Sequence, residues 1–223
     1  MRFPLFFLGS TTLLLGVALT TSFLLPTVEA AGLADNGAMN LLPGMPPVID
    51  PNDIYSQDRP GMLSPVVRNF PSRVYVPNTK GNSVDVIDPK TFKIVDHFAV
   101  GREPQHVVPS WDLKKLWVTQ DLQDQITMID PATGKKGPTI HVDDPYNMYY
   151  TPDGKEAIIC AERQRRLDFR DAQTLKVIKR VPVGCEGVNH IDFSRDGRYL
   201  IATCEFSGEI RKVDGPGQRV ISK

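Results

Sequence analysis

Apolar and polar residues alternate in short stretches along the chain from Arg73 onwards. SVDVID (83–88) and RLDFRD (166–171) each place apolar side chains at every second position, with turn residues after them. This period of two is typical of strands with one buried face. The 3.6-residue period of an amphipathic helix does not occur in these stretches. The pattern therefore predicts an all-β chain.

The strands recur as repeats of nearly constant length. An aspartate closes the same strand of each repeat, and these aspartates follow one another in steps of 42, 41 and 43 residues: Asp88, Asp130, Asp171 and Asp214. Several short strands in a period of about 40–45 residues indicate a β-propeller built from four-stranded blades.

One repeat shows how a blade divides into strands. From the channel outwards the expected strands are residues 145–151, 156–161, 166–171 and 175–182. Asp-Gly pairs, at 153–154 and 196–197, fit the turns between first and second strands, because glycine accepts a positive φ. Asp-Pro pairs, at 88–89 and 130–131, fit the turns between third and fourth strands.

Two of the repeats carry a recognisable motif. Tyr75-Val76-Pro77-Asn78 is followed by Val86-Ile87-Asp88-Pro89, and Trp117-Val118-Thr119-Gln120 by Met128-Ile129-Asp130-Pro131. These residues resemble the YVTN-type β-propeller repeats of secreted bacterial proteins, over Arg73 to about Asp214. The resemblance implies a ring of about seven blades. It leaves function open, since such propellers serve as surface proteins, binding scaffolds or cofactor-carrying oxidoreductase domains.

The chain supplies fewer blades than such a ring needs. Residues 73–99 form a blade without its innermost strand, 105–142 and 146–182 form full blades, and 217–222 would be the outer strand of a fourth. We therefore expect three to four blades of an incomplete ring, in a partial chain whose end blades expose apolar surface. In the alternative, a four-bladed ring, residues 65–70 would lend the missing inner strand.

The segment before the repeats predicts export. Residues 1–30 hold an uncharged run after Arg2 and end in Val28-Glu29-Ala30, which fits a signal peptide cleaved after Ala30. The same run is long enough to be retained as a membrane anchor. Residues 31–72 are rich in proline and are expected to form an extended arm or linker. The remainder is expected in the periplasm, outside the cell or at its surface, away from the membrane after cleavage.

Charge excludes some partners. Twenty-six basic and twenty-six acidic side chains cancel, so the chain has no overall field to attract nucleic acid or an anionic membrane. The sequence also lacks a phosphate-binding glycine loop, a nucleophile elbow and a haem attachment motif. A protein or small-molecule ligand is the expected partner.

Two histidines and an asparagine recur at one place in the repeats. His106, Asn147 and His190 each stand six residues before the turn aspartate of an innermost strand. Equal spacing predicts that they meet at one mouth of the channel. Histidines from successive blades resemble the ligand rings of copper-cluster propellers, so His106 and His190 are candidate ligands of a transition metal. The alternative is that all three residues only satisfy the backbone of the inner strands.

Other polar residues lie near that mouth or on outer strands. Glu162 and Glu205 are equivalent to Asp121, at the ends of second strands, and could act as ligands, as bases or simply as solvated charges on the rim. His97 and His141 fall on outer strands and are expected to be solvated, as is the basic turn 163–166.

Cysteine usage fits an exported chain. A hairpin brings Cys204 near Cys185, which predicts a disulfide between them, whereas Cys160 is expected to stay a buried free thiol. The alternative is three unpaired cysteines.

Two functions follow from these patterns. The favoured one is an exported binding or interaction scaffold with a polar channel mouth. The other is a metal-dependent oxidoreductase, of the copper type, or a hydrolase, with His106 and His190 as metal ligands.

Overall fold

The computed structural model describes residues 60–151, 154–194 and 197–223. These residues belong to one compact unit, Gly37–Lys223. The predicted signal peptide and most of the predicted proline-rich arm lie outside the described residues. No helix within the described ranges has the length and apolar character to cross a membrane.

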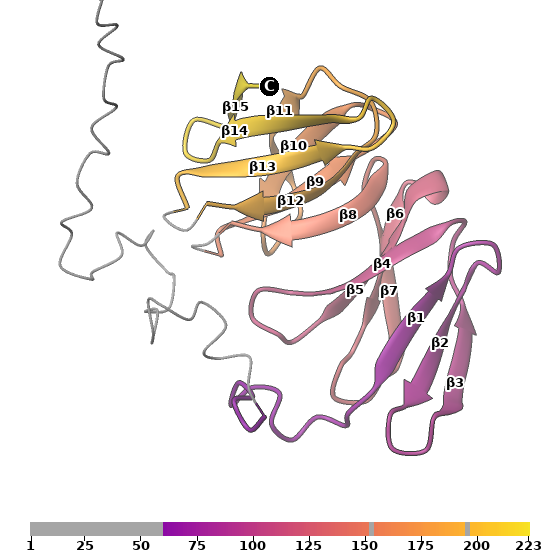
Figure 1. Cartoon of the computed structure of the whole chain (residues 1–223). Helices are drawn as coiled ribbons and strands as arrows, with labels where there is room; N and C mark the ends of the chain where they lie inside the picture. Colours follow the sequence, from indigo (N-terminus) through magenta and orange to yellow (C-terminus); the bar gives the residue numbers. More distant parts are fainter. Residues whose placement is uncertain (1–59, 152–153, 195–196) are drawn as a thin grey trace, which may run out of the picture. The chain divides into compact units, whose positions relative to one another are not determined.

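The described chain forms four antiparallel sheets, each made of strands that are consecutive in sequence (Figure 1). The first holds β1 (Val74–Asn78), β2 (Ser83–Asp88) and β3 (Lys93–Ala99). The second holds β4 (Pro104–Pro109), β5 (Leu116–Gln120), β6 (Gln125–Ile129) and β7 (Lys136–His141). The third holds β8 (Pro145–Tyr150), β9 (Glu156–Ala161), β10 (Arg166–Asp171) and β11 (Val177–Pro182). The fourth holds β12 (Val188–Phe193), β13 (Tyr199–Cys204), β14 (Glu209–Asp214) and β15 (Arg219–Ser222).

The prediction of four-stranded propeller blades is confirmed. The first sheet has three strands, and no strand of the described residues pairs with β1 on the side where the innermost strand would lie. The described residues form no closed ring. Residues 65–69 form turns rather than a strand. The alternative in which residues 65–70 complete the first blade is therefore wrong.

Aspartates hold the turns between third and fourth strands. The carboxylate of Asp88 accepts hydrogen bonds from the Lys90 backbone N–H at 2.9 Å and from the Thr91 hydroxyl at 3.0 Å. These bonds lower the pKa of Asp88. Asp130 is held in the same way by the backbone N–H of Ala132, at 2.8 Å. The repeated aspartate thus marks a turn that needs an acceptor.

The turns between first and second strands use glycine. Gly154 and Gly197 have φ of 71° and 66°, a region that side chains with a Cβ rarely adopt. The aspartates that precede them, Asp153 and Asp196, lie outside the described residues.

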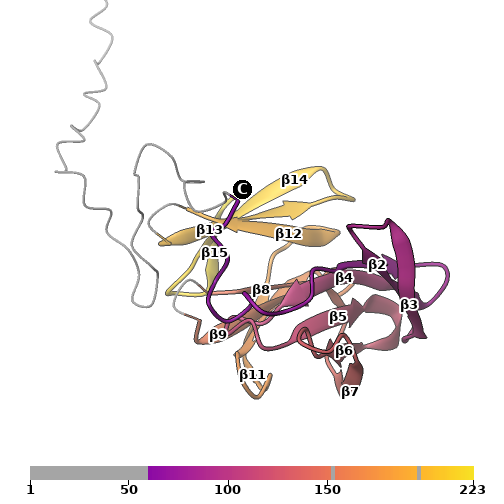
Figure 2. The ribbon, with the colours of Figure 1, turned by 90° about the horizontal axis from the view of Figure 1, so that it is seen from below.

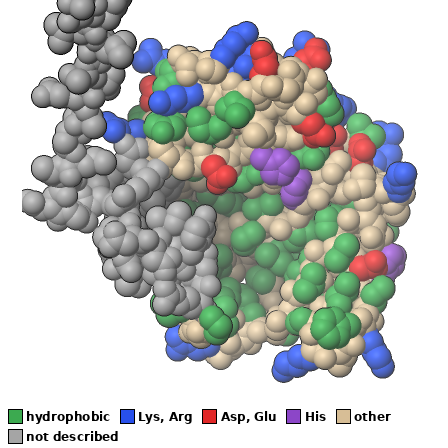
Figure 3. Space-filling model, viewed as in Figure 1, with side chains coloured by type: hydrophobic (Ala, Val, Ile, Leu, Met, Phe, Trp, Pro, Cys, Tyr) green, Lys and Arg blue, Asp and Glu red, His purple; other side chains and the backbone are tan. Residues whose placement is uncertain are grey.

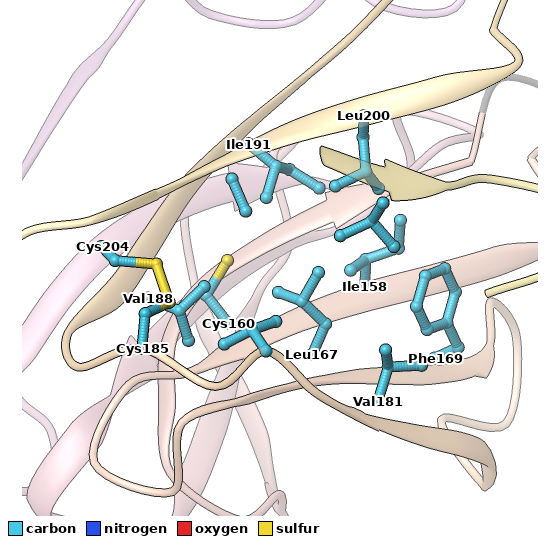
Figure 4. Close-up of a cluster of buried hydrophobic side chains, with 13 residues drawn as sticks. Ile158, Cys160, Leu167, Phe169, Val181, Cys185, Val188, Ile191, Leu200 and Cys204 are labelled. Atoms are coloured by element: carbon cyan, nitrogen blue, oxygen red, sulfur yellow. A yellow bond between two sulfur atoms is a disulfide. The ribbon is translucent and has the colours of Figure 1, made fainter. Parts of the chain in front are cut away.

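Apolar side chains fill the space between successive sheets. The third and fourth sheets share the largest cluster, which includes Leu167, Phe169, Ile191 and Leu200 (Figure 4). Smaller clusters lie between the second and third sheets and between the first and second. Each sheet therefore buries apolar residues on the faces that meet a neighbour, as the alternating pattern requires.

A disulfide lies at the edge of the largest cluster. Cys185 and Cys204 are bonded, with their Cα atoms 6.0 Å apart, and Figure 4 shows the bond beside Val188. Cys160 is a free thiol buried in the same cluster.

The innermost strands of the last three sheets are neighbours. β8 contacts β4 on one side and β12 on the other, and the course of each sheet away from these strands can be followed in a second view (Figure 2). Residues at the same height on β4, β8 and β12 can therefore meet, although no two of these strands share a sheet.

Candidate functional site

Strand register places the three predicted channel residues at equivalent positions. His190 pairs with Thr203, and Asn147 pairs with Cys160, one strand further out in each sheet. The His106 N–H donates to the hydroxyl of Thr119, the equivalent of these partners, at 3.0 Å. Equal spacing from the turns thus corresponds to equal height on the strands.

Three aromatic rings meet at this height. The ring centres of His106 and His190 are 5.5 Å apart, and their planes cross at 82°. Tyr146 stands 5.3 Å from His106 and 6.1 Å from His190, also edge to face. We call His106, Tyr146 and His190 the ring triad. Histidine side chains gather near the middle of the face seen in Figure 3, beside a hollow lined by hydrophobic side chains.

Asn147 does not join the ring triad. Its side chain donates to the Tyr149 hydroxyl at 2.9 Å, accepts from the Met148 N–H at 2.8 Å and is almost fully buried. The residue before it, Tyr146, falls in an irregularity of the β8 ladder, between the pairs made by Pro145 and Asn147. The ring of a residue outside the ladder can turn to the channel side. The expectation that Asn147 faces the two histidines therefore needs correction, and Tyr146 takes that place.

The ring of His106 is fixed by a backbone carbonyl. Its Nδ1 lies 2.9 Å from the carbonyl oxygen of Tyr146. Because a carbonyl only accepts hydrogen bonds, Nδ1 carries the proton and donates. Burial lowers the pKa of His106, against the opposing effect of this hydrogen bond. The neutral ring then keeps a lone pair on Nε2, which can accept a hydrogen bond or bind a metal ion.

Three carboxylates lie at the ends of the second strands, as predicted. Asp121, Glu162 and Glu205 follow directly after β5, β9 and β13. Asp121 and Glu162 are 3% and 7% exposed, whereas Glu205 is exposed. Glu162 is therefore not a solvated charge. We call these three residues the acidic rim.

Burial and the repulsion of neighbouring carboxylates raise the pKa of two residues of the acidic rim, Asp121 and Glu162. Burial, reinforced by the negative charges of Glu205, Asp144 and Glu103, raises the pKa of Glu162 to about 7. Burial and the neighbouring Asp144 carboxyl raise the pKa of Asp121 to about 7. Ala161, directly before Glu162, pairs with Pro145, directly before Tyr146, so Glu162 lies near the ring triad. Burial and the charge of Glu162 also raise the pKa of Tyr146.

An arginine links the second and third sheets beside the rim. The Nε of Arg163 donates to the fully buried carboxylate of Asp144 at 2.8 Å and lies 3.5 Å from Asp121. Its Nη2 donates to the backbone carbonyl of Asp121 at 2.7 Å. The sequence predicts a solvated basic turn at 163–166, so this bridge is a structural feature that the sequence pattern misses. An arginine in a basic turn gives no signal of partners one sheet away.

An apolar hollow adjoins the ring triad along β4 and β8. It has a volume of about 520 Å³, within the range of small-molecule sites. Its walls include Val107, Trp111, Met148 and Tyr149, together with Asn147, the residue after Tyr146. This geometry offers space for an apolar body next to polar rings.

The two outer histidines lie on exposed strands. His97 contacts Asp85 at 2.6 Å, and His141 contacts Asp143 at 3.0 Å. Across the described part of the chain, no group of three or more His, Cys, Asp or Glu side chains is placed to hold a metal ion. His106 and His190 alone would supply two ligands.

Comparison with known proteins supports the fold. The model of the YNCE-like beta-propeller family matches residues 43–171. No curated protein matches the chain.

Two solved structures resemble it. One is the hydrazine synthase of Kuenenia stuttgartiensis, with 22% identity and a TM-score of 0.58 over 74% of this chain and 51% of that chain. The other is the dihydro-heme d1 dehydrogenase NirN in complex with DHE, with 13% identity and a TM-score of 0.47 over 73% of this chain and 46% of that chain. The chain thus spans about half the length of the solved structures that it matches.

Proposed function

Because this chain belongs to the family of YNCE-like β-propellers, we propose that it is an exported scaffold that binds a ligand at its channel mouth. The observation that carries this proposal is the ring triad. Three sheets each contribute one aromatic ring, and the three centres lie within 5.3–6.1 Å of one another. Side chains that only support the backbone of an inner strand would not have to converge in this way.

The surroundings of the ring triad support binding rather than packing alone. Small-molecule sites combine an apolar wall with a few polar groups that fix orientation. Here the apolar hollow supplies the wall, and the lone pair of His106 Nε2 and the carboxylates of the acidic rim supply the polar groups. The ligand would contact β4, β8 and β12 together.

A ligand screen by NMR tests the proposal. With histidine side chains labelled, a ligand of the channel mouth should shift the resonances of His106 and His190 and leave those of His97 and His141 unchanged. A His190→Ala variant should lose that response. Compounds that bind but shift only the outer histidines would show that the site lies elsewhere.

Export is proposed from the leader-like segment at the start of the sequence. Mass spectrometry of the protein from its native host should find Ala31 at the amino terminus. An intact Met1 in the membrane fraction would instead favour a retained anchor.

A metal-dependent oxidoreductase or hydrolase is the second candidate, favoured by the histidine pair. Two imidazoles that share a zinc ion, with each nitrogen about 2.0–2.1 Å from the metal, have ring centres roughly 5–6 Å apart. The separation of 5.5 Å fits this range. A carbonyl on Nδ1, as in His106, is also the usual outer partner of a metal-binding histidine.

Metal content of the purified protein tests this candidate. Bound zinc or copper in the wild type, lost in His106→Ala and His190→Ala but kept in His141→Ala, would support it. Equal metal content in all four proteins would exclude these ligands.

A further inference from the structure

We propose that Glu162 anchors the ammonium group of a primary amine bound at the ring triad. This inference rests on the proposed function and adds the chemical class of the ligand. It follows from a comparison of the three equivalent carboxylates of the acidic rim, which differ in whether the fold gives them a partner.

Two members of the rim have a polar or charged partner within the fold. The Glu205 carboxylate accepts a hydrogen bond from the Asn189 side-chain amide at 2.8 Å. Asp121 Oδ1 is also buried without a hydrogen bond, but it lies 3.5 Å from the guanidinium of Arg163, whose charge compensates it. Glu162 lacks both kinds of partner: its Oε1 is buried without a hydrogen bond, and no ion pair joins it to another of the described residues. A buried acceptor without a donor is unfavourable, so its presence in a fold calls for an explanation.

The missing partner of Glu162 can be traced to one residue. Asn189, which satisfies Glu205, stands directly before His190 on β12. The equivalent residue on β8 is Tyr146, whose ring belongs to the ring triad and has no amide to offer. Glu162 follows Ala161, which pairs with Pro145 next to Tyr146. The fourth sheet thus has an amide that donates to its rim carboxylate, whereas the third has a tyrosine whose hydroxyl does not reach Glu162 Oε1.

The charge around Glu162 selects a cation. Three carboxylates, those of Glu205, Asp144 and Glu103, act on it, and Arg163 opposes them. Tyr146 and Cys160 also lie within reach of its charge. An anionic ligand would be repelled by this surface. A metal ion would lack the three ligating groups that it needs within the described residues.

The available acceptors favour an ammonium group with N–H bonds. A primary ammonium has three donors, which can serve Glu162 Oε1 and the lone pair of His106 Nε2 while the charge rests against the Tyr146 ring. A quaternary ammonium has no N–H and would leave both acceptors unsatisfied. The apolar hollow beside Asn147 has room for a hydrophobic substituent. We therefore expect a primary amine with an apolar body.

Three probes of similar shape test this inference on the full chain: 2-phenylethylammonium, the neutral 2-phenylethanol and the anionic 3-phenylpropionate. Binding is followed by calorimetry, and by the fluorescence of Trp111, which lines the hollow. The ammonium probe should bind about 10-fold or more tightly than the alcohol, since one charge-assisted hydrogen bond is at stake. The carboxylate should bind weakest.

Glu162→Gln should remove this preference, lowering affinity for the ammonium probe about 10-fold. Glu186→Gln is the control, because Glu186 is an exposed carboxylate outside the acidic rim that pairs with Arg165. In the wild type, the ¹³C resonance of the Glu162 carboxyl should move on titration with the ammonium probe, a readout that does not depend on how a variant folds.

The outcomes separate this inference from the function on which it rests. If the alcohol binds as well as the ammonium, or if Glu162→Gln has no effect, the channel mouth binds ligands but Glu162 is not an ammonium anchor. If millimolar ammonium probe neither binds nor moves the Glu162 resonance, the inference is wrong, and the proposed function is then decided by its own ligand screen.

Discussion

The rings of His106 and His190 lie edge to face with their centres 5.5 Å apart, although a whole sheet separates the two residues in sequence. Neither β4 nor β12 pairs with the other. The contact therefore depends on how the second, third and fourth sheets pack together, and it is a sensitive reporter of that packing. It also gives His190 an effect on the protonation of His106.

His190→Ala should raise the pKa of His106. Burial lowers that pKa first, and the charge of His190 lowers it further. Removing the His190 ring exposes His106 to water and removes the repulsion, and both changes favour the protonated imidazole. An NMR titration of the histidine resonances measures the change. His141→Ala, on an exposed outer strand, should leave the His106 pKa where it is.

Glu162→Gln should stabilise the chain at high pH but not at low pH. The pKa of Glu162 is about 7 in the fold, above its ordinary value of 4.5. Between these values the folded chain binds more protons than the unfolded chain, so stability falls as pH rises through this window. The destabilisation is complete above about pH 7 and absent below about pH 4.5.

Thermal unfolding at pH 5 and pH 8 measures this difference. We expect Glu162→Gln to melt above the wild type at pH 8 by about 2–4 °C for each kcal/mol relieved. At pH 5 the difference in melting temperature between the two proteins should be smaller. The same difference in melting temperature at both pH values would contradict a raised pKa, and Glu186→Gln again serves as the control.

Arg163→Met should destabilise the fold by about 1–3 kcal/mol, because it leaves the buried carboxylate of Asp144 without its charged donor. Urea unfolding measures the loss. Arg165→Met is a matched control two residues away. Arg165 pairs with Glu186, and both side chains are more than half exposed, so its removal should cost less than about 1 kcal/mol. An equal loss of free energy of unfolding in both variants would show that the Arg163 bridge stabilises the fold no more than an exposed ion pair does.

Replacing Cys185 and Cys204 together with alanine should lower stability by about 3 kcal/mol, as expected for a bond that closes a loop of this size. The two residues are 19 positions apart. A reductant should lower the melting temperature of the wild type and leave that of the double variant unchanged. A wild type that is insensitive to reductant even in partly unfolding conditions would contradict a structural disulfide.

The blades could be predicted from sequence because their determinants are local. A strand requires only alternating apolar and polar residues. The turn after it requires only an aspartate followed by a proline, as at Asp88 and Asp130. These signals recur in each repeat, so an error in predicting the strands of one repeat is corrected by comparison with the next. For this reason the bounds predicted for the strand from Glu156 to Ala161 agree with the observed bounds at both ends.

The site could be predicted only in part, because it depends on departures from regularity. Equal spacing correctly put His106 and His190 at one height. It also chose Asn147, since spacing alone does not reveal that the ladder skips Tyr146. The contact of Arg163 with Asp121 joins separate sheets, and a linear pattern contains no signal for such a pair.

Each sheet is a meander of strands that follow one another in sequence, and this has a consequence for how the chain acquires its structure. Every backbone ladder joins neighbouring segments, so loop closure within a sheet is short and fast. A sheet can form as soon as its own segment has been synthesised. Only the face that packs against the following sheet stays uncovered until that sheet has formed. The ring triad, which needs three sheets, is then among the last features to assemble.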